Sequence, residues 1–524
     1  MGLEAFGVQN LRCLTDTKLV PIRPITVLVG RNSSGKSTFL RAFPLLRQSV
    51  ETARESPVLW YHPERVDFGS IQQAMNDRSD DRHVTFHFRA TLGQEGEVTI
   101  GDPAVDLSLR LEGNGNALVR AAEIAVAGHL VQIQFDHAGR LSSLLVNGDD
   151  VMPPGPSIHL VGRAFLIPCF DTSPGQVAYQ PLIHPVWVRS ESRARHHILG
   201  LLESELLSEV FPGRGLGLNQ GLDQGLLIGT HAEMIGQIQR LFSDGRFPDD
   251  FVARLDGRTA RSVDIVHRVV AAMIPNLLQD IDGVIASFMA RVAYLGPQRA
   301  ITERLYRLQD LAVDEVDPRG KNLAMFLHSL SDPERESLAS FAREHLGFDV
   351  KTQNQGLQAE ILINEAAGAP FRNIADVGFG YAEVLPVAAA LWSSCIREPR
   401  TRWRATSLLA LEQPELHLHP AHQARLASMI AGAMLQSRKA GREVKMMVET
   451  HSEALVGGLG ELIADGILEP SDVQIALFDQ DTESRQTTVR FSRFTEEGAL
   501  VDWPFGFFAP VRDDFLVPRR PQTG

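Results

Sequence analysis

The chain has 524 residues, of which 44% are hydrophobic and 22% are charged, as in ordinary soluble globular proteins. At roughly 100 to 200 residues per domain, this length predicts two to four domains. The formal net charge of −13 argues against broad non-specific binding to nucleic acid, which depends on lysine and arginine contacts to phosphate. The three cysteines, Cys13, Cys169 and Cys395, are far apart and lack metal-ligand spacing, so we expect a reducing cytoplasmic location. We expect neither a secretory signal nor a membrane span, since no stretch approaches about 20 apolar residues.

The N-terminal part predicts a strand, a glycine loop and a helix in succession. An apolar strand at 25–29 ends at Gly30, and apolar residues recur with helical spacing over 37–50. The loop between them, GRNSSGKST, fits the pattern G-x-x-x-x-G-K-[ST]. In this pattern backbone amides surround phosphate oxygens, Lys36 places its charge beside the β and γ phosphates, and the Ser37 hydroxyl binds Mg²⁺. We therefore predict ATP and Mg²⁺ as cofactors, with the nucleotide-binding residues Gly30, Asn32, Ser33, Ser34, Gly35, Lys36, Ser37 and Thr38.

The rest of the chain predicts a sheet, a helical region and a second α/β part. Short β-rich segments between Gly and Asp turns predict an antiparallel sheet over 83–168. Helical periodicity covers about 186–289, broken by a glycine-rich stretch at 213–229. Apolar strands follow at 408–411 and 444–448. The expected domains are an N-terminal ATPase lobe at 1–185, a helical insertion at 186–290, a C-terminal ATPase lobe at 291–490 and a small C-terminal segment at 491–524.

The segment LLALEQPELHLHP, at 408–420, is an apolar strand that ends in acidic residues. A carboxylate at a strand end can reach the Mg²⁺ shell, and a second one can orient the attacking water. We expect Glu412 on the metal side. Gln413 and Glu415 are the two candidates for positioning the water. Because an amide cannot accept a proton, the choice between them stays open.

Three weaker features accompany these motifs. His451 follows the strand at 444–448 and can hydrogen-bond a γ-phosphate, although a histidine at a strand end is more often structural. The turn with Gly378 and Gly380 opens an apolar helix, and its amides suit either a γ-phosphate bound to a second subunit or a plain turn. Gln72, in DFGSIQQAMND, suits an Mg²⁺ or water contact, but a solvated amide is the more common interpretation.

Taken in order, these segments resemble the SMC/RecF-like branch of ABC ATPases, close to the OLD-type ATPases of bacterial genome-maintenance and phage-defence systems. The resemblance covers most of the chain outside the helical region and includes NLRCL, PITVLVGRNSSGKST, VAYLGPQRAITERLYRL, DVGFGYAEVLP, LEQPELHLHP and VETHSE. EGALVDWPFGFF, at 497–508, is similar to a C-terminal domain that accompanies this clade. The resemblance implies an α/β fold, an ABC-type ATPase head in which a mixed P-loop sheet joins an antiparallel β subdomain and a helical insertion.

The resemblance also implies that two heads face each other, with each ATP between the glycine loop of one chain and the signature turn of the other. The motifs and the resemblance together give three further sets: a metal set of Ser37, Glu412 and Gln72; a catalytic set of Glu415, Gln413 and His451; and a trans signature set of Gly378, Gly380, Ala382 and Glu383, with Arg12 added to the nucleotide-binding residues.

Two departures from the family pattern concern catalysis. Gln413 stands where related ATPases use a catalytic carboxylate, and Ala382-Glu383 stands where they use a Ser-Gln pair. The carboxylate of Glu383 should weaken closure onto a γ-phosphate unless it points away or pairs with an arginine. We therefore expect slow ATP hydrolysis.

The sequence favours a sensor or scaffold ATPase of a bacterial anti-phage defence system that controls a separately encoded effector, such as a nuclease. No nuclease-like cluster of metal ligands follows the histidine motif. The alternative is a RecF- or SMC-like DNA-repair ATPase that clamps DNA, which the acidic charge and the lack of sustained heptads disfavour. The expected partners are a second copy of the chain, in a homodimer or a larger homo-oligomer, and the effector. Nucleic acid stays open as a partner, and no membrane is expected.

Overall fold

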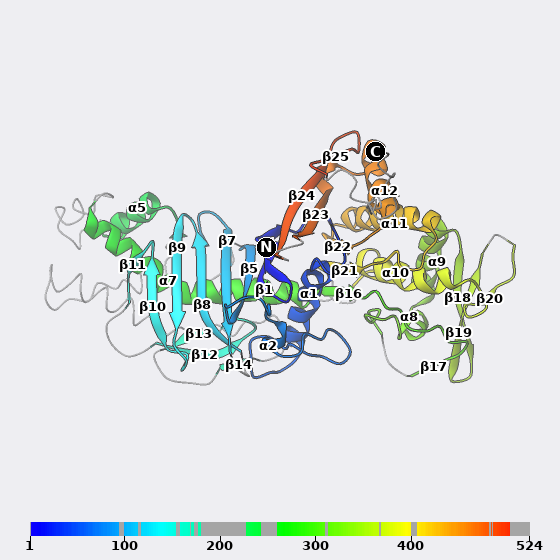
Figure 1. The fold of residues 1–524 in the computed structure, drawn as a ribbon, viewed down its shortest axis with the longest axis horizontal. Coiled ribbons are helices and arrows are strands. Elements are labelled where there is room, and N and C mark those ends of the chain that lie inside the picture. The colour runs from blue at the N-terminus through cyan, green and yellow to red at the C-terminus, as the bar shows by residue number, and fades with distance from the viewer. Residues whose placement is uncertain are drawn as a thin grey trace, which may run out of the picture.

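A computed structural model describes most of the two ends of the chain and less of its middle. The described residues are 2–93, 99–113, 117–152, 158–167, 169–171, 177–179, 227–242, 259–309, 313–365, 368–399, 406–481, 484 and 486–503. The molecule is elongated, with an antiparallel sheet at one end and a mixed sheet flanked by helices toward the other (Figure 1). Of the expected features, the parts of the helical region at 186–226 and 243–258 and the last five residues of the C-terminal motif at 497–508 lie outside the described residues.

The mixed sheet is built from both ends of the chain. Its strands, in spatial order, are β16 (Val292–Leu295), β21 (Leu408–Glu412), β22 (Lys445–Glu449), β4 (Ile25–Gly30), β23 (Val473–Gln480), β24 (Thr487–Phe494) and β25 (Leu500–Val501). The first five are parallel, and the last two pairings are antiparallel. All carboxyl ends of the parallel strands therefore meet at one edge, where open α/β sheets bind ligands.

Alternate residues of these strands belong to two separate cores. Val27 and Leu409 pack with the helices on one face, whereas their neighbours Leu28 and Leu408 pack with those on the other. This follows from the two-residue period of a strand, and burial on both faces explains the continuous apolar runs. The helices of the first face are α8 (Leu323–His328), α9 (Asp332–Leu346), α10 (Phe379–Cys395), α11 (Pro420–Lys439) and α12 (Glu453–Ala464); those of the second are α1 (Lys36–Glu51), α2 (Ile71–Ala74) and α7 (Ala260–Met289).

The antiparallel sheet confirms the β-rich prediction for 83–168, with two differences. Its strands are β11 (Asp149–Asp150), β10 (Leu141–Val146), β9 (His129–Phe135), β8 (Leu118–Val126), β7 (Ala104–Glu112), β5 (His83–Thr91), β1 (Gly2–Leu11), β2 (Leu14–Asp16) and β3 (Val20–Pro21). The long strand β1, from the start of the chain, joins this sheet. Five short strands lie in small separate sheets: β6 (Thr99–Ile100) with β15 (Leu227–Ile228), and β12 (His159–Ala164) with β13 (Cys169–Asp171) and β14 (Val177–Tyr179).

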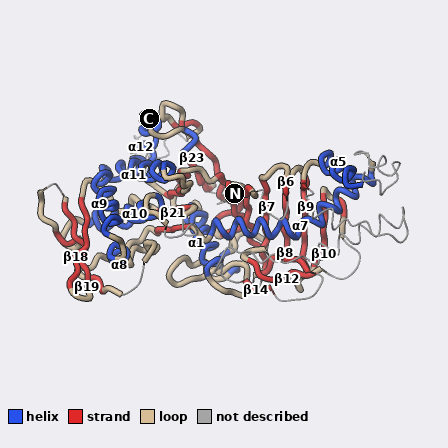
Figure 2. Tube along the Cα trace, turned by 180° about the vertical axis from the view of Figure 1, so that it is seen from behind, coloured by secondary structure: helices blue, strands red, loops and turns tan. Residues whose placement is uncertain are grey.

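Helix α7, which falls within the expected helical insertion at 186–290, packs against the N-terminal lobe. It contacts α1, β1, β5 and β10 and lies along the antiparallel sheet (Figure 2). Its buried Asp282 accepts backbone N–H groups from Phe165, Leu166 and Ile167 at 2.8 to 2.9 Å, which fastens that loop to the helix. The other described helix of this region is α5 (His231–Phe242).

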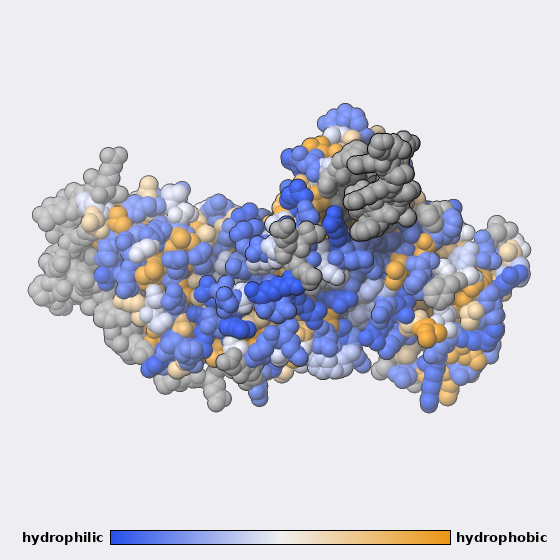
Figure 3. All heavy atoms as spheres, viewed as in Figure 1, coloured by the Kyte–Doolittle hydropathy of each residue, from blue (hydrophilic) through white to orange (hydrophobic). Residues whose placement is uncertain are grey.

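One expectation about membranes needs correction. Among the described residues, Ser262–Met289 of α7 is long and apolar enough to cross a bilayer, although the sequence suggested that no stretch approaches this length. In the structure, 83% of its most apolar window is buried within the protein, which is the pattern of a core helix. The visible surface over the antiparallel sheet is mainly hydrophilic (Figure 3).

A small antiparallel sheet lies at the far end of the C-terminal lobe. Its strands are β17 (Tyr306–Arg307), β18 (Asp349–Gln355), β19 (Gln358–Asn364) and β20 (Arg372–Asn373). Helices α8 and α9 pack against it, and a single 3₁₀ turn at Pro470–Asp472 precedes β23. This sheet leads into α10 through the turn that contains Gly378.

Candidate nucleotide-binding site

The glycine loop joins the end of β4 to the start of α1 in a space too tight for side chains. A Cβ on Gly30 would lie 2.4 Å from the carbonyl oxygen of Phe478 and 2.7 Å from Oγ of Ser34. Gly35 precedes α1 with φ 95°, and a Cβ there would lie 2.3 Å from a methyl group of Leu14. Both positions therefore require glycine.

Lys36 is buried within this loop. Its Nζ donates hydrogen bonds to the carbonyl oxygens of Gly30, at 3.0 Å, and Arg31, at 2.8 Å. Burial lowers the pKa of Lys36, whereas the charges of nearby carboxylates, chiefly Glu449, oppose this shift. Ser33 has φ 65°, a left-handed conformation that suits a concave run of amides. The ammonium thus lies where a phosphate chain would meet the start of α1.

The remaining residues of the predicted loop set lie around this centre. Asn32 is exposed at the tip of the loop, whereas Ser34 is buried. The backbone oxygen of Ser34 accepts a hydrogen bond from the hydroxyl of Thr487 at 3.0 Å, which ties the loop to β24. Thr38 is buried in α1. The contact with Thr487 therefore holds the loop against the mixed sheet.

Ser37 contacts an acidic residue that the sequence analysis did not single out. Its hydroxyl donates to Oε1 of Glu449, at the end of β22, over 2.7 Å. Glu449 is 1% exposed, and its Oε2 is buried without a hydrogen-bond partner among the described residues. Burial and the neighbouring charge of Glu412 raise the pKa of Glu449 to about 7. The carboxylate two residues before His451 in VETHSE was the available sequence signal.

Glu412 is fully engaged by the protein itself. Its carboxylate accepts two hydrogen bonds from Arg41, at 2.6 and 2.8 Å, and one from the hydroxyl of Tyr294, at 2.7 Å. Glu412 is buried at the end of β21 and lies close enough to Glu449 for their charges to interact. Its metal-side role stays a prediction, and Glu449 joins it as a second candidate.

The turn after β21 places the two candidates for water activation differently. Gln413 has φ 45° and donates its backbone N–H to the carbonyl oxygen of Glu449 at 2.9 Å. Glu415 is buried, and its Oε1 accepts the backbone N–H of His451 at 2.7 Å. Oε2 of Glu415 has no hydrogen-bond partner among the described residues, and burial raises the pKa of this carboxyl group. Partial burial and the charge of Lys36 lower the pKa of His451, so the histidine lies near the loop.

The structure brings Arg12 toward the site but holds Gln72 elsewhere. Arg12 donates to the carbonyl oxygen of Asp67 at 2.7 Å and stacks over the ring of Phe68, 4.3 Å from its centroid. The charge of Arg41 contributes to lowering the pKa of Arg12, after burial itself. Gln72 is exposed and donates to the carbonyl oxygen of Gly113 at 3.1 Å, and no described contact joins it to the loop. A different glutamine, the exposed Gln298, follows β16 at the edge of the sheet where the glycine loop lies.

The predicted signature set divides into two parts. Gly378 precedes α10 as its N-cap residue, and a Cβ on Gly378 or Gly380 would meet nothing within 4 Å. Ala382 is partly buried. Glu383 is only 7% exposed and points into the chain, toward the charges of Arg299 and His417. This is the arrangement, near an arginine, in which Glu383 was expected not to weaken closure. Its place in the trans signature set stays a prediction.

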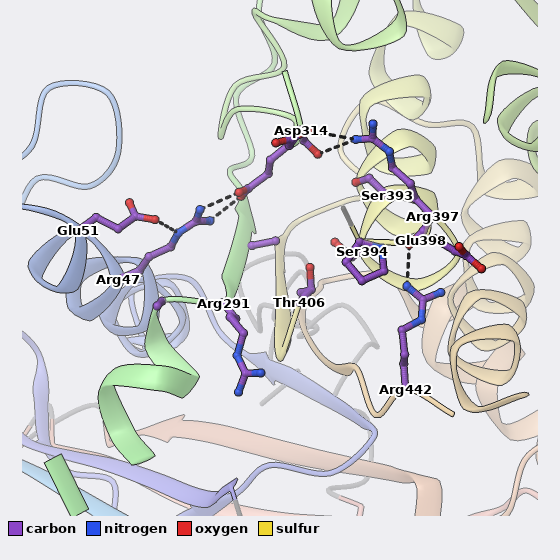
Figure 4. Close-up of a pocket in the computed structure, with 14 residues that line it drawn as sticks. Arg47, Glu51, Arg291, Asp314, Ser393, Ser394, Arg397, Glu398, Thr406 and Arg442 are labelled. Carbon is purple, nitrogen blue, oxygen red and sulfur yellow. Dashed lines mark hydrogen bonds and ion pairs between the residues drawn. The ribbon is translucent and has the colours of Figure 1, made fainter. Parts of the chain in front are cut away.

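A separate cavity of about 280 Å³ lies at the opposite edge of the sheet, where β16 and β21 begin. Figure 4 shows that arginines from α1, α10 and the segment before β22 converge on it. Arg47 pairs with Glu315 and Glu51, and Arg442 donates to the last carbonyl groups of α10. The cavity is thus a charged junction between the two lobes, distinct from the glycine loop.

Comparisons with known proteins match the two segments that build this site. Residues 1–85 match the family described as "AAA ATPase domain", and residues 274–457 match the family described as "AAA domain, putative AbiEii toxin, Type IV TA system". A search of curated proteins found no match.

The solved structures that match this chain include heads of SMC proteins. The Smc head with an extended coiled coil from Pyrococcus furiosus, bound to the C-terminal domain of ScpA, is 11% identical with a TM-score of 0.37, over 94% of this chain and 96% of that one. The SMC head from Thermotoga maritima is 8% identical with a TM-score of 0.35, over 94% and 98% of the two chains. Two segments of the chain are thus similar in sequence to AAA ATPase domains, one with the glycine loop and one with α10, β21 and β22.

Proposed function

We propose that this chain is an ATPase head that binds MgATP between two copies of itself and hydrolyses it slowly. In the cell it would act as the sensor or scaffold of an anti-phage defence system that controls a separate effector. The observation that carries the ATPase proposal is the convergence of Lys36, Ser37 and Glu415 at the carboxyl edge of one parallel sheet.

A divalent cation fits the oxygen atoms around Ser37. The hydroxyl of Ser37 and the carboxylate of Glu449 are in contact, and the second oxygen of Glu449 is buried without a hydrogen-bond partner. Magnesium prefers oxygen ligands and compensates the repulsion between neighbouring carboxylates such as Glu449 and Glu412. When bound, Mg²⁺ would neutralise charge on the phosphates. Ser37 and Glu449 are the residues that would hold it, directly or through water.

Glu415 suits the activation of water better than Gln413 does. A general base must accept a proton, which a carboxylate can do and an amide cannot. Burial of Glu415 raises its pKa and so strengthens it as a base. The contact with the backbone of His451 fixes one oxygen of the carboxylate and leaves the other for water. Glu415 lies two residues after Gln413, the position at which related ATPases carry the catalytic carboxylate. This displacement supports a slow reaction.

The second half of the site would come from another copy of the chain. The amides at the start of α10 surround Gly378 and Gly380, which face open space, so a phosphate on a facing chain can approach them. The inward position of Glu383 removes the like charge that would oppose this approach. We infer that ATP joins two heads.

The defence role is supported by names and resemblance and not by the site. One matched family carries the name of a type IV toxin–antitoxin toxin. The ordered motifs also resemble the OLD-type ATPases. Both favour a conflict-related role over DNA repair, and the effector would be a separate protein.

We predict that Glu415→Gln lowers the steady-state rate of ATP hydrolysis by about 10² to 10⁴, because it removes the general base. Its affinity for ATP should stay within a few-fold of that of the wild type. Phosphate release and nucleotide binding are measured in parallel, with Glu453→Gln, an exposed carboxylate at the start of α12, as the matched control. A normal rate in Glu415→Gln, with a loss of rate in Gln413→Ala, would reverse the assignment.

We predict that Glu449→Gln raises the Mg²⁺ concentration needed for half-maximal ATP binding by about tenfold, because neighbours that orient metal ligands have effects of this size. The measurement is a titration of MgCl₂ against a fluorescent ATP analogue. Glu443→Gln, an exposed carboxylate just before β22, serves as the control and should leave the midpoint unchanged. An unchanged midpoint for Glu449→Gln would remove Glu449 from the metal site.

We predict that Gly378→Asp abolishes ATP-dependent dimerisation but leaves binding of ATP to the monomer intact. Aspartate is a favourable N-cap residue, so α10 should not be weakened, but its charge would face the partner's phosphates. Light scattering of the Glu415→Gln protein with and without ATP reports the dimer. Gly378→Asn, a neutral N-cap, is the control, and a normal dimer with Gly378→Asp would argue against the facing arrangement.

We predict that Lys36→Ala abolishes protection of cells against phage when the gene is expressed with its neighbouring genes. Lys439→Ala, an exposed lysine near the end of α11, is the control and should protect normally. Plaque counts give the result, and purification of the tagged chain tests for the neighbouring gene products. Full protection by Lys36→Ala would refute the defence proposal without affecting the ATPase proposal.

A further inference from the structure

Arg299 is a largely buried arginine whose guanidinium group has unused hydrogen-bonding capacity. It lies four residues beyond β16, and its Nε and Nη1 atoms are buried without a hydrogen-bond partner among the described residues. The described part of the chain places no carboxylate within ion-pair distance of it. Burial lowers its pKa to about 10. Because a desolvated cation without a partner is costly, this position is best explained by an anion that binds there.

The surroundings of Arg299 join the two halves of the candidate site. The charges that act on it come from Glu383 of α10, then from Tyr294, Glu412 and Glu415 around the end of β21. Glu412 is already bound by Arg41 and Tyr294, and Glu415 accepts the N–H of His451. Arg299 therefore lies between the helix that follows the signature turn and the acidic turn after β21.

The backbone holds Arg299 in place on both sides. The N–H of Gly296 donates to the carbonyl oxygen of Pro318, and the N–H of Ala300 donates to that of Arg319, each over 2.8 Å. Gly320, next in the chain, packs so closely against Pro386 of α10 that a Cβ on it would lie 3.2 Å away. The segment that carries Arg299 is thus tied to α10.

The order and direction of the strands show which anion Arg299 could meet. Strand β16 pairs in parallel with β21, with Leu295 opposite Leu411, so Arg299 leaves the sheet at the same edge as the glycine loop. Resting on the proposed ATPase function, we propose that Arg299 binds the terminal phosphate of the ATP held by its own chain. A guanidinium group can meet a phosphate with two parallel hydrogen bonds, which a buried site strengthens.

This contact would make Arg299 a positioning residue that couples the nucleotide to α10. With a terminal phosphate present, Arg299 turns toward the phosphate and away from Glu383. When ADP is bound, Glu383 is the anion that acts most strongly on Arg299. Because Glu383 belongs to α10, a change in its electrostatic interaction with Arg299 would act on the helix that would face a second head.

The experiment compares nucleotides that differ in the terminal phosphate. Binding of the non-hydrolysable analogue AMPPNP and of ADP to the full chain is measured by calorimetry with Mg²⁺ present. Arg299→Ala should weaken AMPPNP binding by about tenfold or more and leave ADP binding unchanged, as expected for a lost charge-assisted hydrogen bond. Arg299→Lys should restore part of the preference. Arg291→Ala, at the other end of β16, is the matched control and should change neither affinity.

A purely structural role would weaken both nucleotides together, and that result would overturn the proposal, as would no change in either. In both cases the ATPase proposal stands if Lys36→Ala still loses binding. Failure of the wild type to bind either nucleotide would sink both proposals. ADP supplemented with inorganic phosphate distinguishes a site for free phosphate, because tenfold tighter ADP binding in that mixture would contradict recognition of the intact triphosphate.

The coupling is tested by a double-mutant cycle, of which the single variant Glu383→Gln does not depend on how well Arg299→Ala folds. Glu383→Gln should raise the preference for AMPPNP over ADP a few-fold, because Arg299 is then released from its competing anion. In the Arg299→Ala background, Glu383→Gln should have no effect on this preference. The same effect in both backgrounds would show that the two residues act independently and would refute the coupling.

Discussion

The architecture depends on a buried cluster in which Arg41 and Tyr294 both bind the carboxylate of Glu412. These residues come from α1, β16 and β21, so one carboxylate joins segments that are hundreds of positions apart. The side chain of Arg41 is 34% exposed and therefore partly screened by solvent, so removing it should cost less than the roughly 3 to 5 kcal/mol typical of a fully buried pair. The cluster holds the helix of the glycine loop against the strand that ends in acids, and the rest of the site follows from that alignment.

Whether the sequence could predict a feature of this site depends on how far apart along the chain the contacting residues are. The glycine loop could be predicted because its requirements are local: Gly30 and Gly35 have no space for a side chain, and Lys36 reaches back only to its own loop. Glu449 was missed because its contact with Ser37 links residues 412 positions apart. A strand-end acid before a histidine is a signal only when the order of the strands is known.

The surroundings of helix α7 and of Glu383 could not be predicted from the sequence, since periodicity gives the type of an element but not its neighbours. The apolar pattern predicted the helix correctly, yet only the tertiary structure shows that α7 covers the antiparallel sheet and is buried along most of its length. Likewise, the glycine turn predicted the start of α10, but a helix turns by about 100° per residue, so Glu383 lies inside while Gly378 lies outside.

The balance of charges at the edge of the sheet explains why a triphosphate would complete the site. Three carboxylates, from Glu412, Glu415 and Glu449, are buried there. Among the described cations nearby, Arg41 is neutralised by Glu412, whereas Lys36 bonds only to carbonyl oxygens and Arg299 forms no ion pair. A magnesium ion would compensate the carboxylates that have no cation, and the phosphate chain would compensate Lys36 and Arg299. Because each charge is most costly when it is buried alone, metal and nucleotide should enter together, and the loss of the terminal phosphate should be felt first at Arg299.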